Sequence, residues 1–141
     1  MWNDALMETP FRKEFEEEYG TLIFLNMEIE KKTFDPSLIS MLQEENELTS
    51  EYQKLIASAQ IPFEGENYTL SQITPFKNDA NDERRLSAWK AEGQWYKDNQ
   101  EELDDLYDKL THVRDAIGRK LGYDGFTELG YYRMQRNCYK K

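Results

Sequence analysis

Apolar residues recur every three or four positions through most of this sequence, which restricts the chain to a mainly helical fold. The clearest stripe consists of Leu103, Leu106, Tyr107, Leu110, Val113, Ile117 and Leu121. Gly122 follows it, at the place where many helices end with a glycine in the left-handed conformation. The spacing therefore predicts a long amphipathic helix that ends near Leu121.

Two earlier stripes predict long helices in the first half of the chain. The first helix is expected over about residues 10–32, with Thr9-Pro10 at its start. Its stripe consists of Phe15, Tyr19, Leu22, Asn26 and Ile29, widened by Phe11, Ile23 and Leu25. The second helix is expected from Asp35-Pro36, a capping residue followed by a first-turn proline, to about residue 58.

The helical rhythm gives way to alternation near residues 59–70. Ile61 and Phe63 alternate with polar neighbours before a turn that contains Gly65, and a similar alternation follows that turn. This pattern is typical of a short β-hairpin. Pro62 restricts the first strand to a sheet edge because proline has no amide hydrogen for the ladder.

Helical signals return after the hairpin. Thr69 and Gln72 have the spacing of a capping box, which predicts one turn over residues 70–75. The next apolar stripe consists of Leu86, Trp89, Gly93 and Tyr96, after several potential caps between Asn78 and Asp82. Asp124 is expected to cap a last helix that runs to about Asn137. The whole pattern predicts an all-α fold of about five mainly antiparallel helices with one inserted β-hairpin, built as a single helical domain over residues 1–141.

Composition excludes several partners. The chain carries 28 acidic and 18 basic residues, and the net charge of −10 repels phosphate backbones. No apolar run approaches the roughly 18 residues of a membrane span. We therefore expect neither nucleic acid nor membrane as a partner. The single cysteine, Cys138, fits a reducing cytoplasm because it leaves no internal disulfide to form.

The sole histidine, His112, limits the metal chemistry open to the chain. A zinc peptidase helix needs two histidines one turn apart, so that both imidazoles face one metal ion. A carboxylate-bridged di-iron bundle needs Glu-x-x-His pairs, whereas Lys109 stands three residues before His112. We expect no catalytic residue, no cofactor-binding residue and no metal ligand in this chain.

Two further kinds of site, a calcium site and a cysteine–histidine nucleophile pair, explain the sequence less well than ordinary structural roles for the same residues. One is a calcium site among Glu101, Glu102, Asp104, Asp105 and Asp108. Calcium loops need a tight glycine bend, and the positive end of a helix dipole already explains acids at a helix start. The other is a Cys138–His112 nucleophile pair, for which a buried or idle cysteine is the commoner explanation.

Ordered motifs run through the chain from about residue 5 to residue 139. They are Thr9–Arg12, Gln43–Asn46, Leu55–Ser58, Tyr68–Gln72, Arg85 with Ala88, Glu102–Asp104 followed by Arg114, Lys120–Tyr123 and Glu128–Arg136. In this order they resemble the oligoendopeptidase F family of thimet-type zinc metallopeptidases. Members of that family are much longer, so the resemblance implies an internal fragment of a cytoplasmic peptidase that cleaves short peptides.

The resemblance also implies what the fragment lacks. The family holds zinc with a His-Glu-x-x-His helix and a further Glu, and none of these has a counterpart here. We therefore expect a non-catalytic scaffold or cleft wall, inactive alone, with zinc only in the full-length parent. The expected cleft contributors are Tyr131, Tyr132, Arg133 and Arg136, because arginine can pair with a peptide carboxylate. Core packing of the tyrosines and ion pairs to Asp or Glu are the alternatives.

The expected partner is the remainder of the parent peptidase. Helices shaped to pack against absent neighbours expose apolar patches, so the isolated chain is expected to form a homo-oligomer. The alternative function is a free-standing acidic helical interaction module derived from the peptidase.

Overall fold

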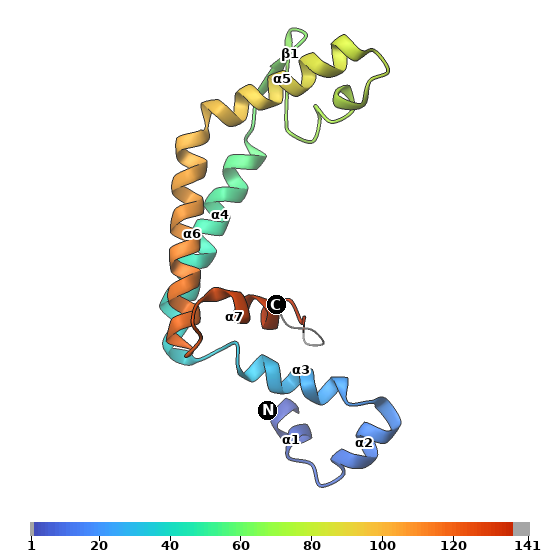
Figure 1. Cartoon of the computed structure of the whole chain (residues 1–141), viewed down its shortest axis with the longest axis vertical. Helices are drawn as coiled ribbons and strands as arrows, with labels where there is room; N and C mark the ends of the chain where they lie inside the picture. The colour runs from blue at the N-terminus through green and yellow to red at the C-terminus, as the bar shows by residue number, and fades with distance from the viewer. Residues whose placement is uncertain (1, 137–141) are drawn as a thin grey trace. The chain divides into compact units, whose positions relative to one another are not determined.

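The computed structural model describes residues 2–136, which contain seven α-helices and one two-stranded sheet (Figure 1). The helices are α1 (Trp2–Met7), α2 (Arg12–Tyr19), α3 (Leu22–Lys31), α4 (Ile39–Ala57), α5 (Asp82–Asp98), α6 (Gln100–Lys120) and α7 (Phe126–Arg133), with short 3-10 helices at η1 (Pro36–Leu38) and η2 (Phe76–Asn78). The strands are β1 (Ile61–Phe63) and β2 (Glu66–Tyr68). The predicted all-α fold with an inserted hairpin is confirmed. None of the described helices is long and apolar enough to cross a membrane.

The chain divides into two compact units. Unit 1 combines Met1–Gln43 with Val113–Lys141, and unit 2 is Glu44–His112. The division therefore falls inside α4 and α6. A single domain over residues 1–141 stays a prediction.

The expected helix over residues 10–32 is interrupted. Gly20 adopts a φ of 83°, so α2 ends at Tyr19 and α3 begins afresh at Leu22. Because this left-handed residue breaks the hydrogen-bonded ladder, the two helices no longer share one face. Helix α2 has no buried residue, while α3 buries Phe24, which lay outside the predicted stripe, together with Ile29.

Helix α1 was not expected from its mixed sequence. Its polar side chains contact α3: Asp4 Oδ1 lies 2.8 Å from Lys31 Nζ, and Asn3 Nδ2 donates to Glu30 Oε2 at 3.3 Å. The Lys31 hydrogen bond contributes most to lowering the pKa of Asp4, to about 2. Tertiary contacts of this kind override weak helix propensity in a short segment.

The core of unit 2 lies between the hairpin and α5, which Figure 1 shows beside each other. Ile61 and Phe63 are buried and Pro62 between them is exposed, as the alternation predicted. A two-residue turn joins the strands, with Glu64 and Gly65 both at positive φ. The buried cluster consists of Ala59, Ile61, Phe63, Ile73, Ala88 and Trp95.

Helices α4 and α6 run antiparallel within unit 2. Leu55 near the end of α4 and Leu103 near the start of α6 pack against the same cluster. One turn earlier in α4, Glu51 acts electrostatically on Lys109, which lies later in α6. Residue numbers fall along α4 from the first contact to the second while they rise along α6, so the two helices are antiparallel.

The predicted caps and restarts are largely confirmed. Asp35 Oδ1 accepts a hydrogen bond from the Ser37 amide at 2.8 Å. The Ser37 side chain first, and this amide second, lower the pKa of Asp35. Thr69 and Gln72 exchange the two bonds of a capping box, at 3.3 and 3.0 Å. Asn81 caps α5 by accepting two amides.

Arg84 of α5 forms an ion pair with Glu64 in the hairpin turn. Its guanidinium donates to both carboxylate oxygens of Glu64, at 2.8 and 2.7 Å, and to Asp79 Oδ2 at 2.9 Å. It also lies 4.8 Å from the centre of the Phe76 ring. The pair holds the pKa of Glu64 below its ordinary value, so this contact stabilises the fold above that value and is lost as the pH falls through the lowered one.

Candidate functional site

The predicted cleft residues lie on α7 and just after it, in unit 1. Two glycines shape the connection between α6 and α7. Gly122, at a φ of 89°, ends α6 as predicted, with the Tyr123 amide donating to the Gly118 carbonyl at 3.1 Å. The expected Asp124 cap is wrong. Gly125 is the residue before α7, and no side chain caps the helix there.

Helix α7 ends earlier than expected. It stops at Arg133, and Gln135 takes a φ of 55°. The Arg136 amide donates to the Tyr131 carbonyl at 2.9 Å, which closes the left-handed end that C-terminal motifs use. Asn137, the predicted end, lies outside the described residues, as does Cys138.

Tyr132 is held by its neighbours. Its hydroxyl donates to Glu128 Oε1 at 2.7 Å, and this bond raises the pKa of Tyr132. Its ring centre lies 5.8 Å from that of Tyr123, and Lys32 Nζ lies 6.0 Å from the Tyr132 ring centre. Tyr123 in turn donates to the Lys32 carbonyl at 3.1 Å. The ring is therefore fixed at the contact between α7 and the end of α3.

The other three predicted residues differ in exposure. Arg133 is half-buried, with its guanidinium carbon 5.7 Å from the centre of the Phe126 ring. Tyr131 is also half-buried, whereas Arg136 is exposed. Two of the four, Tyr132 and Arg133, line a common cavity in unit 1.

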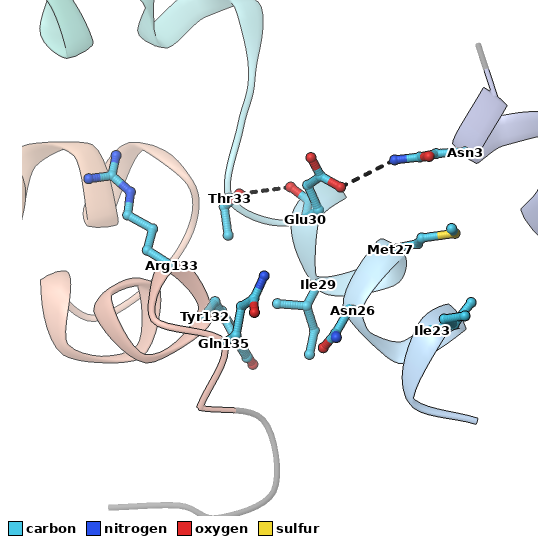
Figure 2. A pocket seen from close by; sticks show the side chains of 10 residues that line it. All are labelled: Asn3, Ile23, Asn26, Met27, Ile29, Glu30, Thr33, Tyr132, Arg133 and Gln135. Carbon is cyan, nitrogen blue, oxygen red and sulfur yellow. Dashed lines mark hydrogen bonds between the residues drawn. The ribbon is translucent and has the colours of Figure 1, made fainter. Parts of the chain in front are cut away.

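This cavity has a volume of about 480 Å³ and lies among α1, α3 and the end of α7 (Figure 2). Its lining residues are Asn3, Ile23, Asn26, Met27, Ile29, Glu30, Thr33, Tyr132, Arg133 and Gln135. Figure 2 shows the Arg133 guanidinium turned away from the α3 side chains. The groups that line the cavity are therefore side-chain amides, the Glu30 carboxylate and aliphatic side chains, while the Arg133 guanidinium points away from α3.

The α3 side of the cavity was missed by the sequence reasoning. Asn26 falls within the apolar stripe from Phe15 to Ile29, where a polar residue is out of place. That irregularity was the available signal, because a polar side chain on an apolar face needs a partner or a water-filled space. Glu30 and Asn3 carried no comparable signal, since polar residues on an exposed helix face are ordinary.

Glu30 is the one carboxylate among the described lining residues of the cavity. Asn3 Nδ2 and the Thr33 hydroxyl already engage Glu30, the latter through its carbonyl at 2.8 Å. Among its described lining residues there is no histidine, cysteine or lysine to pair with Glu30 as acid and base.

The residues that the structure describes do not form a zinc site. Zinc needs at least three converging ligands, and within the described part of the chain no three His, Cys, Asp or Glu side chains gather. His112 is exposed on α6, and its Nδ1 lies 2.9 Å from the Asp108 carbonyl oxygen of the preceding turn.

Comparisons with known proteins place the chain among solved peptidase structures. No family model matches it, and no curated protein does. A crystal structure of a protein assigned as oligoendopeptidase F is 47% identical, with a TM-score of 0.88. PZ peptidase A with an inhibitor is 43% identical (TM-score 0.86), and a Bacillus anthracis strain Ames protein assigned as oligoendopeptidase F is 42% identical (TM-score 0.87). Each match covers 99% of this chain but only 25 or 26% of the other.

Proposed function

Because the chain belongs to the oligoendopeptidase F family in sequence and fold, we propose that it is a non-catalytic scaffold and cleft-wall segment of a longer zinc peptidase acting on short peptides. The carrying observation is the match over 99% of this chain at 42–47% identity, alongside its span of about a quarter of the matched chains.

The partner in this proposal is the remainder of the peptidase, which contributes zinc and its ligands. Helix α2 and the start of α3 support it, because large apolar side chains there face outward. These exposed residues are Phe11, Phe15, Tyr19, Leu22, Ile23 and Leu25. Surfaces of this kind commonly mark contacts with other chain segments. The cleft-wall role is assigned to Tyr131, Tyr132, Arg133 and Arg136, and the compartment to the cytoplasm.

A chimeric enzyme tests the proposal. PZ peptidase A is prepared with its matching segment replaced by this chain, and cleavage of a fluorogenic short peptide is measured in the presence of zinc. We expect cleavage within about tenfold of intact PZ peptidase A, which is about 1.4 kcal/mol in the barrier, because a scaffold segment leaves the reacting groups unchanged.

Two controls make the result decisive. The same host carrying the matching segment of the Bacillus anthracis protein shows that the position accepts a homologous segment. The host with the segment deleted gives the background. If the Bacillus segment restores cleavage and this chain does not, the scaffold proposal is wrong and the interaction-module alternative gains support.

Exposed apolar faces also predict self-association of the isolated chain. We expect size exclusion with light scattering to give a mass of at least two chains at high concentration, falling on dilution. Replacing Phe15 and Leu22 with Glu should shift the population toward the monomer, since both side chains are exposed in the structure. A monomer at every concentration contradicts this expectation.

A further inference from the structure

The apolar stripe of α5 does not face the core of unit 2. Leu86, Trp89 and Tyr96 are 55, 54 and 42% exposed, and Gly93 completes the helical spacing between them. We call these four residues the outer stripe. Such regular apolar spacing on a solvent-facing helix surface is expected where another element packs.

Unit 2 does not need the outer stripe for its own core. The opposite face of α5 supplies Ala88 and Trp95 to the buried cluster, with Ala91 packed against it. That cluster already joins the hairpin, α5 and the ends of α4 and α6. The outer stripe contributes no residue to this cluster, so the core of unit 2 does not account for its apolar character.

Trp89 is held in place as a rigid apolar contact point. Its indole Nε1 donates to the Lys77 carbonyl at 3.3 Å, and Lys77 Nζ lies 4.5 Å from the indole ring centre. Lys77 is itself fixed by Glu92. A preordered tryptophan loses little side-chain entropy on binding, and tryptophan is enriched among the residues that contribute most to binding energy at interfaces.

Gly93 adds an opening beside Trp89. A Cβ built on Gly93 meets no atom within 4 Å. A glycine between two aromatic residues of one face allows an incoming backbone to approach closely. The Trp89 side chain and the open space at Gly93 together form an uneven surface. Such a surface suits packing against an adjacent helix better than a flat one does.

Charge identifies the character of that neighbour. Lys90 follows Leu86 by four residues and Lys97 follows Gly93 by four, so both lie along one border of the stripe. Both are exposed. A basic border in a chain of net charge −10 favours a partner with acidic flanks. In an antiparallel pair of copies the two-fold axis would place both lysine borders on the same side of the seam, which disfavours that pairing.

We propose that the outer stripe seats an amphipathic helix from the remainder of the longer peptidase, one with an apolar face and Asp or Glu along its flank. This rests on the proposed function. The match covers only 25% of each related chain, so the other three quarters of such an enzyme can supply the element that covers this face. The stripe is thus a contact between this segment and the rest of its enzyme.

Cysteine accessibility tests the proposal. Gly93→Cys is made in a Cys138→Ser background, and its rate of reaction with N-ethylmaleimide is compared in the isolated chain and in the PZ peptidase A chimera. We expect the rate to fall on the order of tenfold or more in the chimera, because cover excludes the reagent. Ser87→Cys, about a quarter turn away from Leu86, is the matched control and should keep its rate.

The outcomes separate the inference from the proposed function. If the chimera cleaves peptide but Gly93→Cys stays as reactive as in the isolated chain, or Ser87→Cys is equally protected, the inference is overturned and the scaffold function stands. Protection that rises with concentration of the isolated chain, or that needs added peptide, also overturns it. An inactive chimera, in a host that the Bacillus segment keeps active, overturns both.

A second variant guards against misfolding of the first. Leu86→Glu places a charge on the stripe, and the isolated chain should keep its thermal midpoint because this side chain is 55% exposed. In the chimera the same change should lower the midpoint and the cleavage rate. Equal thermal midpoints for the chimera with Leu86→Glu and the chimera without it would count against a buried contact at this stripe.

Discussion

Gly118→Ala should destabilise unit 1 more than any other single methyl group added to a glycine of this chain. A Cβ on Gly118 would lie 2.6 Å from the Gly125 carbonyl carbon and 3.0 Å from the Phe126 amide nitrogen. Both are backbone atoms at the start of α7, so no side-chain rotation relieves the clash. We expect a loss of about 3 kcal/mol in the free energy of unfolding, the upper end for overpacking, measured by urea denaturation.

Gly93→Ala is the matched control for this change. Gly93 also lies inside a helix, but a Cβ there meets open space. The isolated chain should gain up to about 1 kcal/mol from the better helix propensity of alanine. Hydrogen exchange should localise the Gly118→Ala effect to α7. Equal stability of the Gly118→Ala and wild-type chains would contradict the close approach of α6 to Gly125.

Lys77→Met should destabilise unit 2 strongly. Lys77 Nζ donates to Glu92 Oε1 and Oε2 at 2.8 and 2.7 Å, and the two side chains are only 13 and 11% exposed. Methionine keeps much of the packing but leaves the Glu92 carboxylate without its cation in a largely dry site. We expect a loss of about 3 kcal/mol, the lower end for breaking a buried pair, in urea unfolding followed by tryptophan fluorescence.

A double variant separates lost attraction from stranded charge. Lys77→Met with Glu92→Leu removes both charges and should recover most of the stability, because apolar replacement of a buried pair is often neutral. Lys109→Met on α6 is the exposed control: its pair with Asp105 at 2.6 Å has side chains more than half exposed and should matter little. A double variant as unstable as Lys77→Met would show that packing rather than charge carries the effect.

Local signals in the sequence predicted many features correctly, because the atoms that decide them lie within a few residues. Asp35, the Thr69–Gln72 box and Gly122 each satisfy backbone groups within their own turn. The hairpin followed from alternation and one glycine, and the structure places its inward residues in the core. The family resemblance, carried by ordered motifs, was likewise a property of the sequence and agrees with the solved structures.

Errors arose where one residue had two physical solutions. Gly20 can continue a helix at a small cost or end it with a positive φ, and the periodic stripe around it favoured the first. Asp124 had the chemistry of a cap, yet the close approach of Gly125 to α6 sets the start of α7 one residue later. The contact between α6 and Gly125, distant from any local rule, decides that boundary.

The candidate site could be predicted only in part. Tyr132 and Arg133 were chosen from composition and the resemblance, and both line the unit 1 cavity. Its other wall comes from α1 and α3, roughly a hundred residues earlier, and no spacing rule links such distant positions. Side-chain direction also lay beyond the sequence, since Arg133 is directed toward Phe126.

The sequence by itself determined the helical class, the inserted hairpin, the family and the lack of two histidines, because period, turn chemistry and composition act locally. Only the tertiary structure decided which apolar stripes are buried. Both faces of α5 carry apolar residues, and only the face with Ala88 and Trp95 joins the buried cluster of the hairpin. A helix cannot specify from its own spacing which apolar face will find a neighbour, since burial depends on the elements that pack against it.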